Sequence, residues 1–424
     1  MFLLVLAIFI VLIVLRVRLA FALLVASIVY FTAVGIPLDL VAQRVIATTQ
    51  SFPLLAIPLF ILAGNLMNET GMTMRLFRLA EVLLGRIHGG LGHVVVAVGM
   101  IMAGTSGSAI ADAAALSRVA IDEMERLGYP RAFSASICAF AATMGPLIPP
   151  SIMFIVYGWL ANVSINKLFL AGAIPGALVG VFLFVTIYVI AKRRNFPVVQ
   201  KRPTARDVIK AFKEAVWAAA MPIVILGGIV IGAFTATEAA AVAVGYALLV
   251  GTLVFRTLKL PQIIAALQET VRTATAIMFV VAAAYPFGWI ITAEQVPQEL
   301  LHAATSITSS PWVVLLIVNI VLFLLGMVME STAILLIVVP ALVPLMTAMG
   351  VDLVHFGVIV TANLLLGTIT PPFGILMFTT CAVGKVSVLE FQKASIPFYA
   401  AFVLLIILVT YVPSISLWLP SVLF

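Results

Sequence analysis

Long apolar runs constrain this chain more than any other feature of its sequence. Of its 424 residues, 64% are hydrophobic and only 9% are charged. A soluble domain usually has about a quarter charged residues, so it could not hide this much apolar surface in a core. A membrane-spanning helix needs roughly 20 mostly apolar residues. The sequence therefore predicts one multi-pass, all-α membrane domain over residues 1–424, with on the order of ten crossings.

The predicted crossings follow one another along the whole chain. The first segment begins directly with apolar residues and has no charged leader or small-residue cleavage site, so we expect it to be retained rather than removed as a signal peptide. The predicted apolar segments are 2–15, 19–36, 51–67, 168–190, 217–234, 239–255, 274–292, 312–328 and a last span within 396–417.

A basic stretch separates these segments into two groups. From Lys192 to Ala215, eight residues are Lys or Arg and two are acidic. Short cytoplasmic loops of membrane proteins carry such an excess of basic residues. We therefore expect residues 192–215 to be a cytoplasmic loop between a first half, 1–191, and a second half, 216–424. The net charge of +7 then reports topology and gives little support to nucleic-acid binding.

The two halves contain a matching element. GPLIPPSI starts at Gly145 and GTITPPFG starts at Gly367, which is an offset of 222 residues. Carried without gaps, this offset also pairs glycines and prolines at other helix-breaking positions, and it pairs Ser108, Ala109 and Ile110 with Glu330, Ser331 and Thr332. The further pairs are Gly104 with Gly326, Gly128 with Gly350, Pro149 with Pro371 and Pro150 with Pro372. We interpret the offset as an internal repeat.

Each repeat has a polar tip followed, about 40 residues later, by an interrupted helix. A Pro-Pro pair removes two backbone donors, and non-helical backbone at membrane depth is tolerated only inside protein or along a cavity. Paired broken segments are typical of secondary transporters, whose sites lie near the midplane between repeats. Helix N-termini can hold an anion, and carbonyls with hydroxyls can hold a hard cation. This pattern predicts cation-coupled uptake of an anion.

Several long motifs in order carry a resemblance that covers nearly the whole chain. They include SFPLLAIPLFILAGNLM from Ser51, GTSGSAIADAAA from Gly104, LGMVMESTAILLIVVPALVPL from Leu325 and HFGVIVTANLLLGTITPPFG from His355. With these motifs the chain resembles the large membrane subunit of the tripartite ATP-independent periplasmic (TRAP) transporters, a DctM-like member of the ion transporter superfamily. At the polar tip of the second repeat, Glu330 and Ser331 stand where that family often has Asp and Pro.

The resemblance implies two inverted-topology repeats, each with a re-entrant helical hairpin and a broken transmembrane helix, which work by an elevator movement. It implies a bacterial inner-membrane transporter, not an enzyme, that takes up small organic acids by sodium symport and has no cofactor besides the coupling ions. A periplasmic solute-binding protein would deliver the substrate. A small four-helix membrane subunit would be a separate polypeptide, because no extra helices precede Met1.

Combining the repeat with this resemblance gives candidate site residues. Asp112 and Glu330 stay open, because an intramembrane acid can face a cation or complement its own helix N-terminus. Thr235 and Glu238 form a T-x-x-E pattern, for which we favour helix capping. The candidate sodium ligands are Ser106, Thr143, Gly145, Gly326, Ser331, Asn363, Gly367 and Thr370, and the candidate substrate contacts are Ser108, Ala109, Thr332, Pro150 and Pro372.

Two other functions are alternatives for this chain. An intramembrane hydrolase would rest on Ser106 and Asp112, but G-T-S-G-S is not the G-x-S-x-G elbow of such enzymes. A stand-alone transporter of the same superfamily, without a binding protein, is the closer alternative. The chain has no G-x-x-x-x-G-K-[ST] loop, so ATP is not expected to drive transport. The four histidines lack metal-ligand spacing, and the two cysteines, Cys138 and Cys381, give no disulfide framework.

Overall fold

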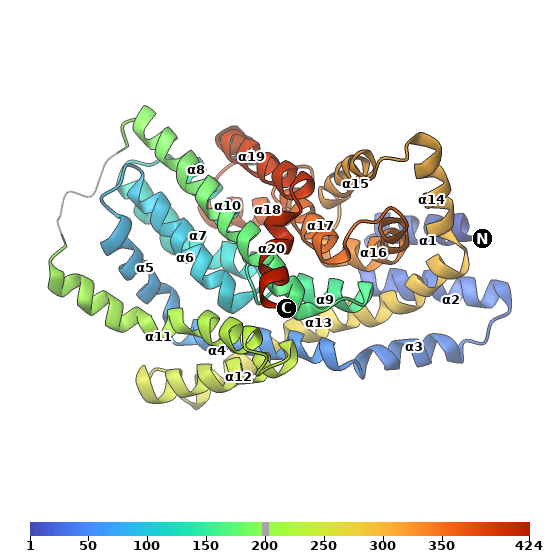
Figure 1. Cartoon of the computed structure of the whole chain (residues 1–424). Coiled ribbons are helices and arrows are strands. Elements are labelled where there is room, and N and C mark those ends of the chain that lie inside the picture. Colours follow the sequence, from blue (N-terminus) through green and yellow to red (C-terminus); the bar gives the residue numbers. More distant parts are fainter. Residues whose placement is uncertain (197–202) are drawn as a thin grey trace.

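The computed structural model describes residues 1–196 and 203–424, and it describes no side chain for Thr105 and Ser106. The described residues form helices, turns and connecting segments, with no strand among them (Figure 1). Two short non-α turns interrupt the helices, a 3-10 turn at Phe52–Leu55 and a π-helical turn at Val250–Val254. The predicted all-α class is confirmed.

The α-helices of the first half occupy most of the chain up to the basic stretch. They are α1 (Phe2–Val14), α2 (Leu19–Val34), α3 (Asp39–Thr49), α4 (Ala56–Glu69), α5 (Met72–Leu84), α6 (Gly90–Ser106), α7 (Ala109–Arg126), α8 (Arg131–Ala142), α9 (Ile152–Ala161) and α10 (Ile165–Arg193).

The second half contains a matching series. Its helices are α11 (Ala205–Val230), α12 (Ala236–Leu249), α13 (Leu260–Ala293), α14 (Val296–Ile307), α15 (Pro311–Gly326), α16 (Ser331–Ala348), α17 (Leu353–Gly367), α18 (Ile375–Gly384), α19 (Val388–Tyr411) and α20 (Ser414–Leu423).

Seven helical segments among the described residues are long and apolar enough to cross a membrane, and the bent pair α14 and α15 adds an eighth. The remaining apolar helices have 10–17 residues. Several of these are short because they end at a hairpin tip or at a Pro-Pro break, as α6, α8 and α17 do. Polytopic membrane insertion is therefore confirmed, although many elements do not span alone.

The basic stretch is only partly a loop. α10 continues to Arg193, and α11 already begins at Ala205, because Thr204 and Asp207 form a capping box there. The expectation of a loop up to Ala215 was thus wrong for its last part. Residues 197–202 of this stretch lie outside the described residues.

The 222-residue offset relates more than the two glycine-proline segments. Adding 222 to the bounds of α7 gives residues 331 and 348, which are the bounds of α16. Adding it to the start of α8 gives the start of α17. α9 and α10 likewise correspond to α18 and α19 within a residue or two at their starts. Both halves therefore fold the same sequence of hairpin, broken helix and long helix.

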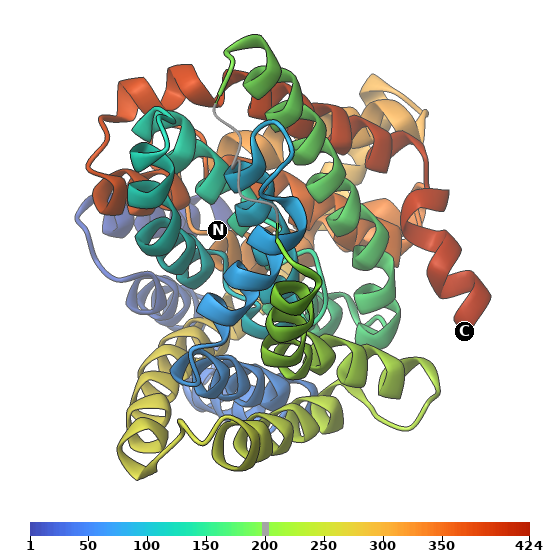
Figure 2. The same ribbon diagram turned by 90° about the vertical axis from the view of Figure 1, so that its left-hand side faces the viewer.

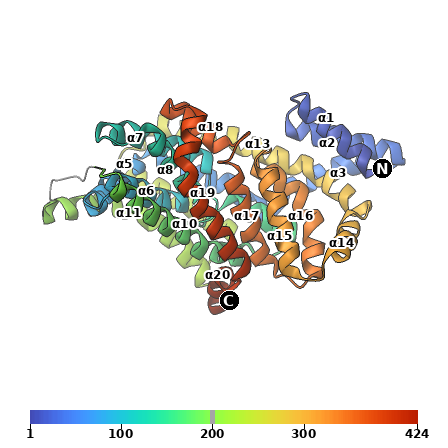
Figure 3. The ribbon, with the colours of Figure 1, turned by 90° about the horizontal axis from the view of Figure 1, so that it is seen from above.

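The helices form two groups. In one, α4 packs against α12 and α13, and α13 also contacts α2 and α3. Figure 1 shows these helices along the lower side of the molecule, and Figure 2 shows the blue and yellow helices gathered there as well. Seen from above in Figure 3, α1 and α2 lie at one end and α5 and α11 at the other.

In the other group the two halves exchange partners. α18 of the second half packs against α7 of the first, and α9 of the first half packs against α16 of the second. α10 contacts α17, and α19 correspondingly contacts α8. A reciprocal arrangement of this kind is what inverted repeats around a pseudo-two-fold axis produce. It brings both polar tips to the same region.

Candidate functional site

The first tip lies between α6 and α7. Gly107 has φ +59°, a left-handed conformation that glycine adopts at low cost, and it turns the chain out of α6. Ser108 is the N-cap of α7, where its hydroxyl oxygen accepts a hydrogen bond from the Ala111 amide at 3.4 Å. The tip therefore presents the N-terminal end of α7, whose amides and dipole favour a negative charge.

The second tip lies between α15 and α16. Glu330 is the N-cap of α16, and its carboxylate accepts from the Ala333 amide at 3.1 Å and from the Thr332 hydroxyl at 2.9 Å. These bonds support the capping role for Glu330. The carboxylate satisfies one free amide of the helix end, as an N-terminal acid is expected to do.

Both helix breaks contain a cis peptide bond, between Pro149 and Pro150 and between Pro371 and Pro372. In the first break, Ser151 caps α9 by accepting from the Phe154 amide at 3.2 Å. The second break is bonded to its hairpin instead. There the Phe373 amide donates to the Met327 carbonyl at 3.0 Å. Each break is thus held by backbone groups that a continuous helix would have used internally.

A buried carboxylate lies beside the first break. Asp112 is 1% exposed, and its Oδ2 is 2.8 Å from the point that a Cβ on Gly145 would occupy. In the second half, Ile334 stands in place of Asp112, and the backbones of Gly326 and Gly367 touch. A Cβ on Gly367 would lie 2.4 Å from the Gly326 carbonyl carbon. Gly145 faces a charged side chain, whereas Gly367 faces backbone.

Three candidate sodium ligands already make hydrogen bonds to main-chain groups of their own helices. Thr143 donates to the Phe140 carbonyl at 2.6 Å, and Thr370 donates to the Leu366 carbonyl at 2.8 Å. The Asn363 amide donates to Asn319 Oδ1 at 2.6 Å and to the Ile359 carbonyl at 3.0 Å. A cation at these residues would use their remaining oxygen lone pairs.

The serines of the two tips differ in what the structure describes. The Ser331 hydroxyl is buried and has no hydrogen-bond partner among the described residues. The side chain of Ser106 lies outside the described residues. A buried hydroxyl usually has a partner, so an oxygen-binding ligand is one way to satisfy Ser331.

A cavity of about 640 Å³ lies between the two tips. Residues 107–111 of the first tip and 330–332 of the second line it, together with Pro146, Thr368 and the first residues of α9 and α18. Of the candidate residues, Ser108, Ala109, Ser331 and Thr332 lie on its wall. The volume suits a small organic molecule.

The other candidates lie away from this wall. The Pro150 carbonyl oxygen is behind the first tip, 3.1 Å from the Cβ position of Gly107. Thr235 and Glu238 form the capping box of α12, in which the Glu238 carboxylate accepts from the Thr235 amide at 2.8 Å. The remaining candidates absent from the wall are Thr143, Gly145, Gly326, Asn363, Gly367, Thr370 and Pro372.

One wall of the cavity was not predicted from the sequence. Glu269, Arg272 and Thr273 of α13 face the tips, followed on the same face by Ala276, Ile277 and Val280. The signal was present, since these residues recur every three or four positions as on one face of a helix. The predicted apolar segment begins only at residue 274, so these polar residues lie outside every predicted crossing.

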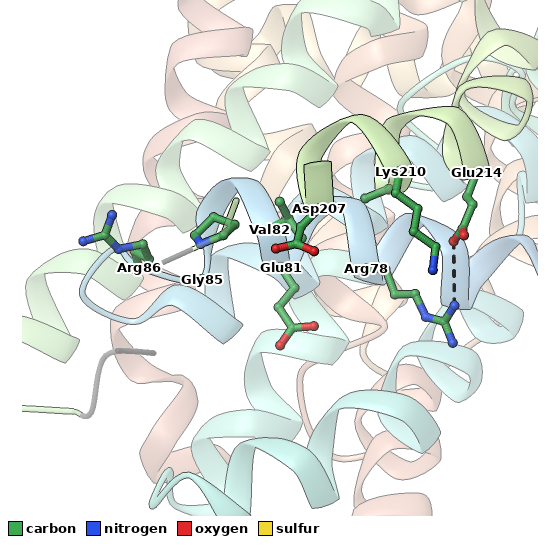
Figure 4. A pocket seen from close by; sticks show the side chains of 10 residues that line it. Arg78, Glu81, Val82, Gly85, Arg86, Asp207, Lys210 and Glu214 are labelled. Carbon is green, nitrogen blue, oxygen red and sulfur yellow. Dashed lines mark ion pairs between the residues drawn. The ribbon is translucent and has the colours of Figure 1, made fainter. Parts of the chain in front are cut away.

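A second cavity, of about 330 Å³, lies between α5 and α11 (Figure 4). Arg78 and Glu214 form an ion pair across it at 3.7 Å. Its charged lining is balanced, and it contains no residue of a tip or a break. The basic residues are Arg78, Arg86 and Lys210, and the acidic ones are Glu81, Asp207 and Glu214. We interpret it as a polar crevice at the membrane surface.

Known proteins share both the sequence and the fold. The family model described as tripartite ATP-independent periplasmic transporter, DctM component, matches residues 6–415. The chain is 40% identical to the sialic acid TRAP transporter large permease protein SiaM of Vibrio cholerae, over 91% of this chain and 90% of that one. It is also 40% identical to the C4-dicarboxylate TRAP transporter large permease protein DctM of Pseudomonas aeruginosa, over 90% and 89%.

A solved structure supports the architecture. The YdaH transporter of Alcanivorax borkumensis matches with a TM-score of 0.62 over 88% of both chains, at 12% identity. A likeness at this identity concerns the fold alone. The match to SiaM and DctM, and the family model over almost the entire sequence, identify a transporter permease of the inner membrane. The chain belongs to the tripartite ATP-independent periplasmic transporters, as a member of their DctM component.

Proposed function

We propose that the chain is the large permease subunit of a sodium-coupled transporter that takes up small organic acids. The observation that carries this proposal is the convergence of both tips on one cavity. There the N-terminal end of α7 would hold a carboxylate of the substrate, while the N-terminal end of α16 is capped by the chain's own Glu330. The substrates in the names of the relatives SiaM and DctM are sialic acid and C4-dicarboxylates, and both are carboxylates.

Two cation sites of unequal chemistry would flank this cavity. The first would combine Asp112 with the carbonyls around Gly145, and the second would combine Ser331 with those around Gly326 and Gly367. Oxygen ligands of this kind suit a hard cation such as sodium. The buried position of the Asp112 carboxylate and of the Ser331 hydroxyl supports the proposal.

Transport would proceed by movement of the tips past α13 and α4. These two helices pack against each other and against α2, α3 and α12, which gives them support from outside the hairpins. The family's own description, tripartite and periplasmic, supports two further components, a periplasmic binding protein and a separate small membrane subunit.

Uptake into proteoliposomes tests the proposal. The purified chain, with and without its binding protein and small subunit, is given labelled sialic acid or succinate under an inward sodium gradient or an equal potassium gradient. We expect uptake of one acid with sodium, binding protein and small subunit together. Equal uptake in potassium would contradict sodium coupling. Full uptake by the large subunit alone would favour the stand-alone alternative.

A pair of alanine substitutions tests the second cation site. We expect Ser331→Ala to raise the sodium concentration for half-maximal uptake, because it removes an uncharged oxygen ligand. Ser421→Ala is the matched control, since the Ser421 hydroxyl bonds only its own helix at the exposed end of α20. An unchanged sodium requirement in Ser331→Ala would mean that the second cation site does not include Ser331.

A further inference from the structure

The α13 wall of the tip cavity is polar at one end and apolar at the other. Glu269, Arg272 and Thr273 lie on successive turns of one helix face, and Ala276 and Val280 continue that face. α13 has 34 residues without interruption, so at 1.5 Å per residue it extends about 50 Å, longer than the roughly 30 Å bilayer core. The polar end therefore belongs to the same continuous helix as the membrane-spanning part of α13, and it lies on the wall of the tip cavity.

The acidic groups on the cavity wall already have hydrogen-bond partners. Glu269 accepts from the Thr273 hydroxyl at 3.4 Å, and Glu330 accepts from the second tip's own groups. Arg272 is the one cationic side chain among the described residues of this wall, and it forms no ion pair with any of them. An ionisable residue within a membrane segment usually faces a water-filled cavity and serves function.

We propose that Arg272 is the anion-selecting residue of this cavity and pairs with a carboxylate of the organic acid. A guanidinium presents a rigid fork of donors that matches a carboxylate in two parallel hydrogen bonds. This inference rests on the proposed function, since it takes an organic anion as the substrate. It adds a positive charge to a site whose tips offer helix ends, hydroxyl groups and the Glu330 carboxylate.

The location of Arg272 defines when it acts. α13 packs against α2, α3 and α4. The tips belong to the other group of helices, in which the two halves pack against each other. A substrate carried by the tips meets Arg272 only while they face this part of α13. Arg272 therefore favours anions at capture or release, from the α13 wall that faces the tip carrying Ser331.

Charged thiol reagents test the electrostatic part without any substrate. Ala276→Cys places a reporter thiol one turn from Arg272, on the same wall, and Val280→Cys is a second reporter if the first variant fails to fold. In purified protein, the reaction rates of the thiol with an anionic and a cationic methanethiosulfonate are compared. Cys138 and Cys381 are buried, and the parent without the reporter measures their background.

We expect Arg272→Gln to lower the anionic-to-cationic rate ratio by about three- to tenfold, because one nearby charge attracts one reagent and repels the other. Glu269→Gln should raise the ratio. Lys259→Gln is the matched control, since Lys259 precedes α13 and does not line the cavity. An unchanged ratio in folded Arg272→Gln would overturn the proposal.

Uptake of the acid that the reconstituted parent transports tests the role in transport. Arg272→Gln should raise the acid concentration for half-maximal uptake by about tenfold or more, since it removes a charge-assisted hydrogen bond to the carboxylate. Arg272→Lys should keep the thiol rate ratio but recover only part of the affinity. Normal affinity in Arg272→Gln would also overturn the proposal. Failure of the parent to transport would instead refute the proposed function, and the thiol ratio would still be measurable.

Discussion

The two halves share their helices but differ in the chemistry at equivalent points. α7 and α16 have the same length and an offset of 222 residues, and each follows a tip and precedes a cis-proline break. Around the first break, Gly145 faces the carboxylate of Asp112, whereas in the second half Gly367 faces the backbone of Gly326. Duplication preserved the breaks, and the side chains around them diverged. The repeat therefore predicts where two sites lie, but not that the sites are alike.

The largest expected effect comes from filling the glycine contact of the second half. In Gly367→Ala, the new Cβ would lie 2.4 Å from the carbonyl carbon of Gly326. Backbone atoms cannot relieve this clash by a change of rotamer, as the end of a side chain could. We expect a loss of about 1–3 kcal/mol of stability from overpacking, together with loss of uptake. Thermal unfolding in detergent and proteoliposome uptake measure the two effects.

Two other alanine variants sharpen this result. In Gly145→Ala the Cβ meets the end of a side chain, Asp112 Oδ2 at 2.8 Å, so stability should fall less than in Gly367→Ala. Gly245→Ala is the control within α12, because a Cβ there meets nothing within 4 Å. Equal unfolding temperatures in all three variants would mean that the two breaks are packed alike, against the comparison.

The second expected effect concerns the acid that only the first half has. Asp112→Asn keeps the shape of the side chain and removes its charge. We expect it to raise the sodium concentration for half-maximal uptake by about tenfold or more, because a charged partner contributes about 1.5–3 kcal/mol. Glu123→Gln is the control on the exposed side of α7, where Glu123 pairs with Arg126. The same sodium requirement in Asp112→Asn and the parent would assign Asp112 to structure alone.

The sequence predicted the repeat because a Pro-Pro pair interrupts a helix inside an apolar segment, whereas single prolines such as Pro175 and Pro286 lie inside continuous helices. The offset derived from Gly145 and Gly367 matches the bounds of whole helices. It did not reveal that α13 is one helix where the first half has α3, a 3-10 turn and α4. Pro53 lies in that turn, and Thr275 takes its place in the second half.

The helical spacing of Glu269, Arg272 and Thr273 is visible in the sequence, but their place opposite the tips is not. A charged residue between apolar segments indicates the membrane surface in most chains, and Arg272 fits that rule from sequence alone. Only the packing of α13 against α16 brings Arg272 opposite the tips. Ser108 and Thr332 were predictable because they belong to the tips themselves.

The third expected effect concerns a buried amide pair that only the second half has. Asn363 donates to Asn319, and Asn319 donates to the Thr410 hydroxyl at 2.9 Å. The first half has Ala97 and Ala141 at these positions. Asn363→Ala should cost about 1–3 kcal/mol, since it leaves a buried amide oxygen without its donor. The free energy of unfolding, from titration of the micelle with SDS, measures this cost.

The double variant Asn319→Ala/Asn363→Ala makes the second half resemble the first. It removes both partners, so it should cost less than the sum of the two single variants. Additive costs would show that the amides do not stabilise each other, and the pair would then be an incidental difference between the halves.

The smallest expected effect tests a contact between α9 and α13. The rings of Trp159 and Tyr285 lie 5.3 Å apart, and Arg44 lies over Tyr285 at 5.8 Å. Cys381 takes the place of Trp159 in the second half, so α18 lacks this contact. A double-mutant cycle with Trp159→Ala and Tyr285→Ala should give a coupling of about 0.5–1.5 kcal/mol, as aromatic pairs do. Trp418→Ala, at a side chain 57% exposed, should show no coupling to Tyr285→Ala. α9 packs against α16 of the second hairpin, whereas α13 forms the wall that faces the tips. A coupling in this range would therefore mean that an aromatic pair links α13 to the helix after the first break and not to its counterpart in the second half. A coupling of zero would leave both halves equally free to move along α13, which would remove this difference from the comparison.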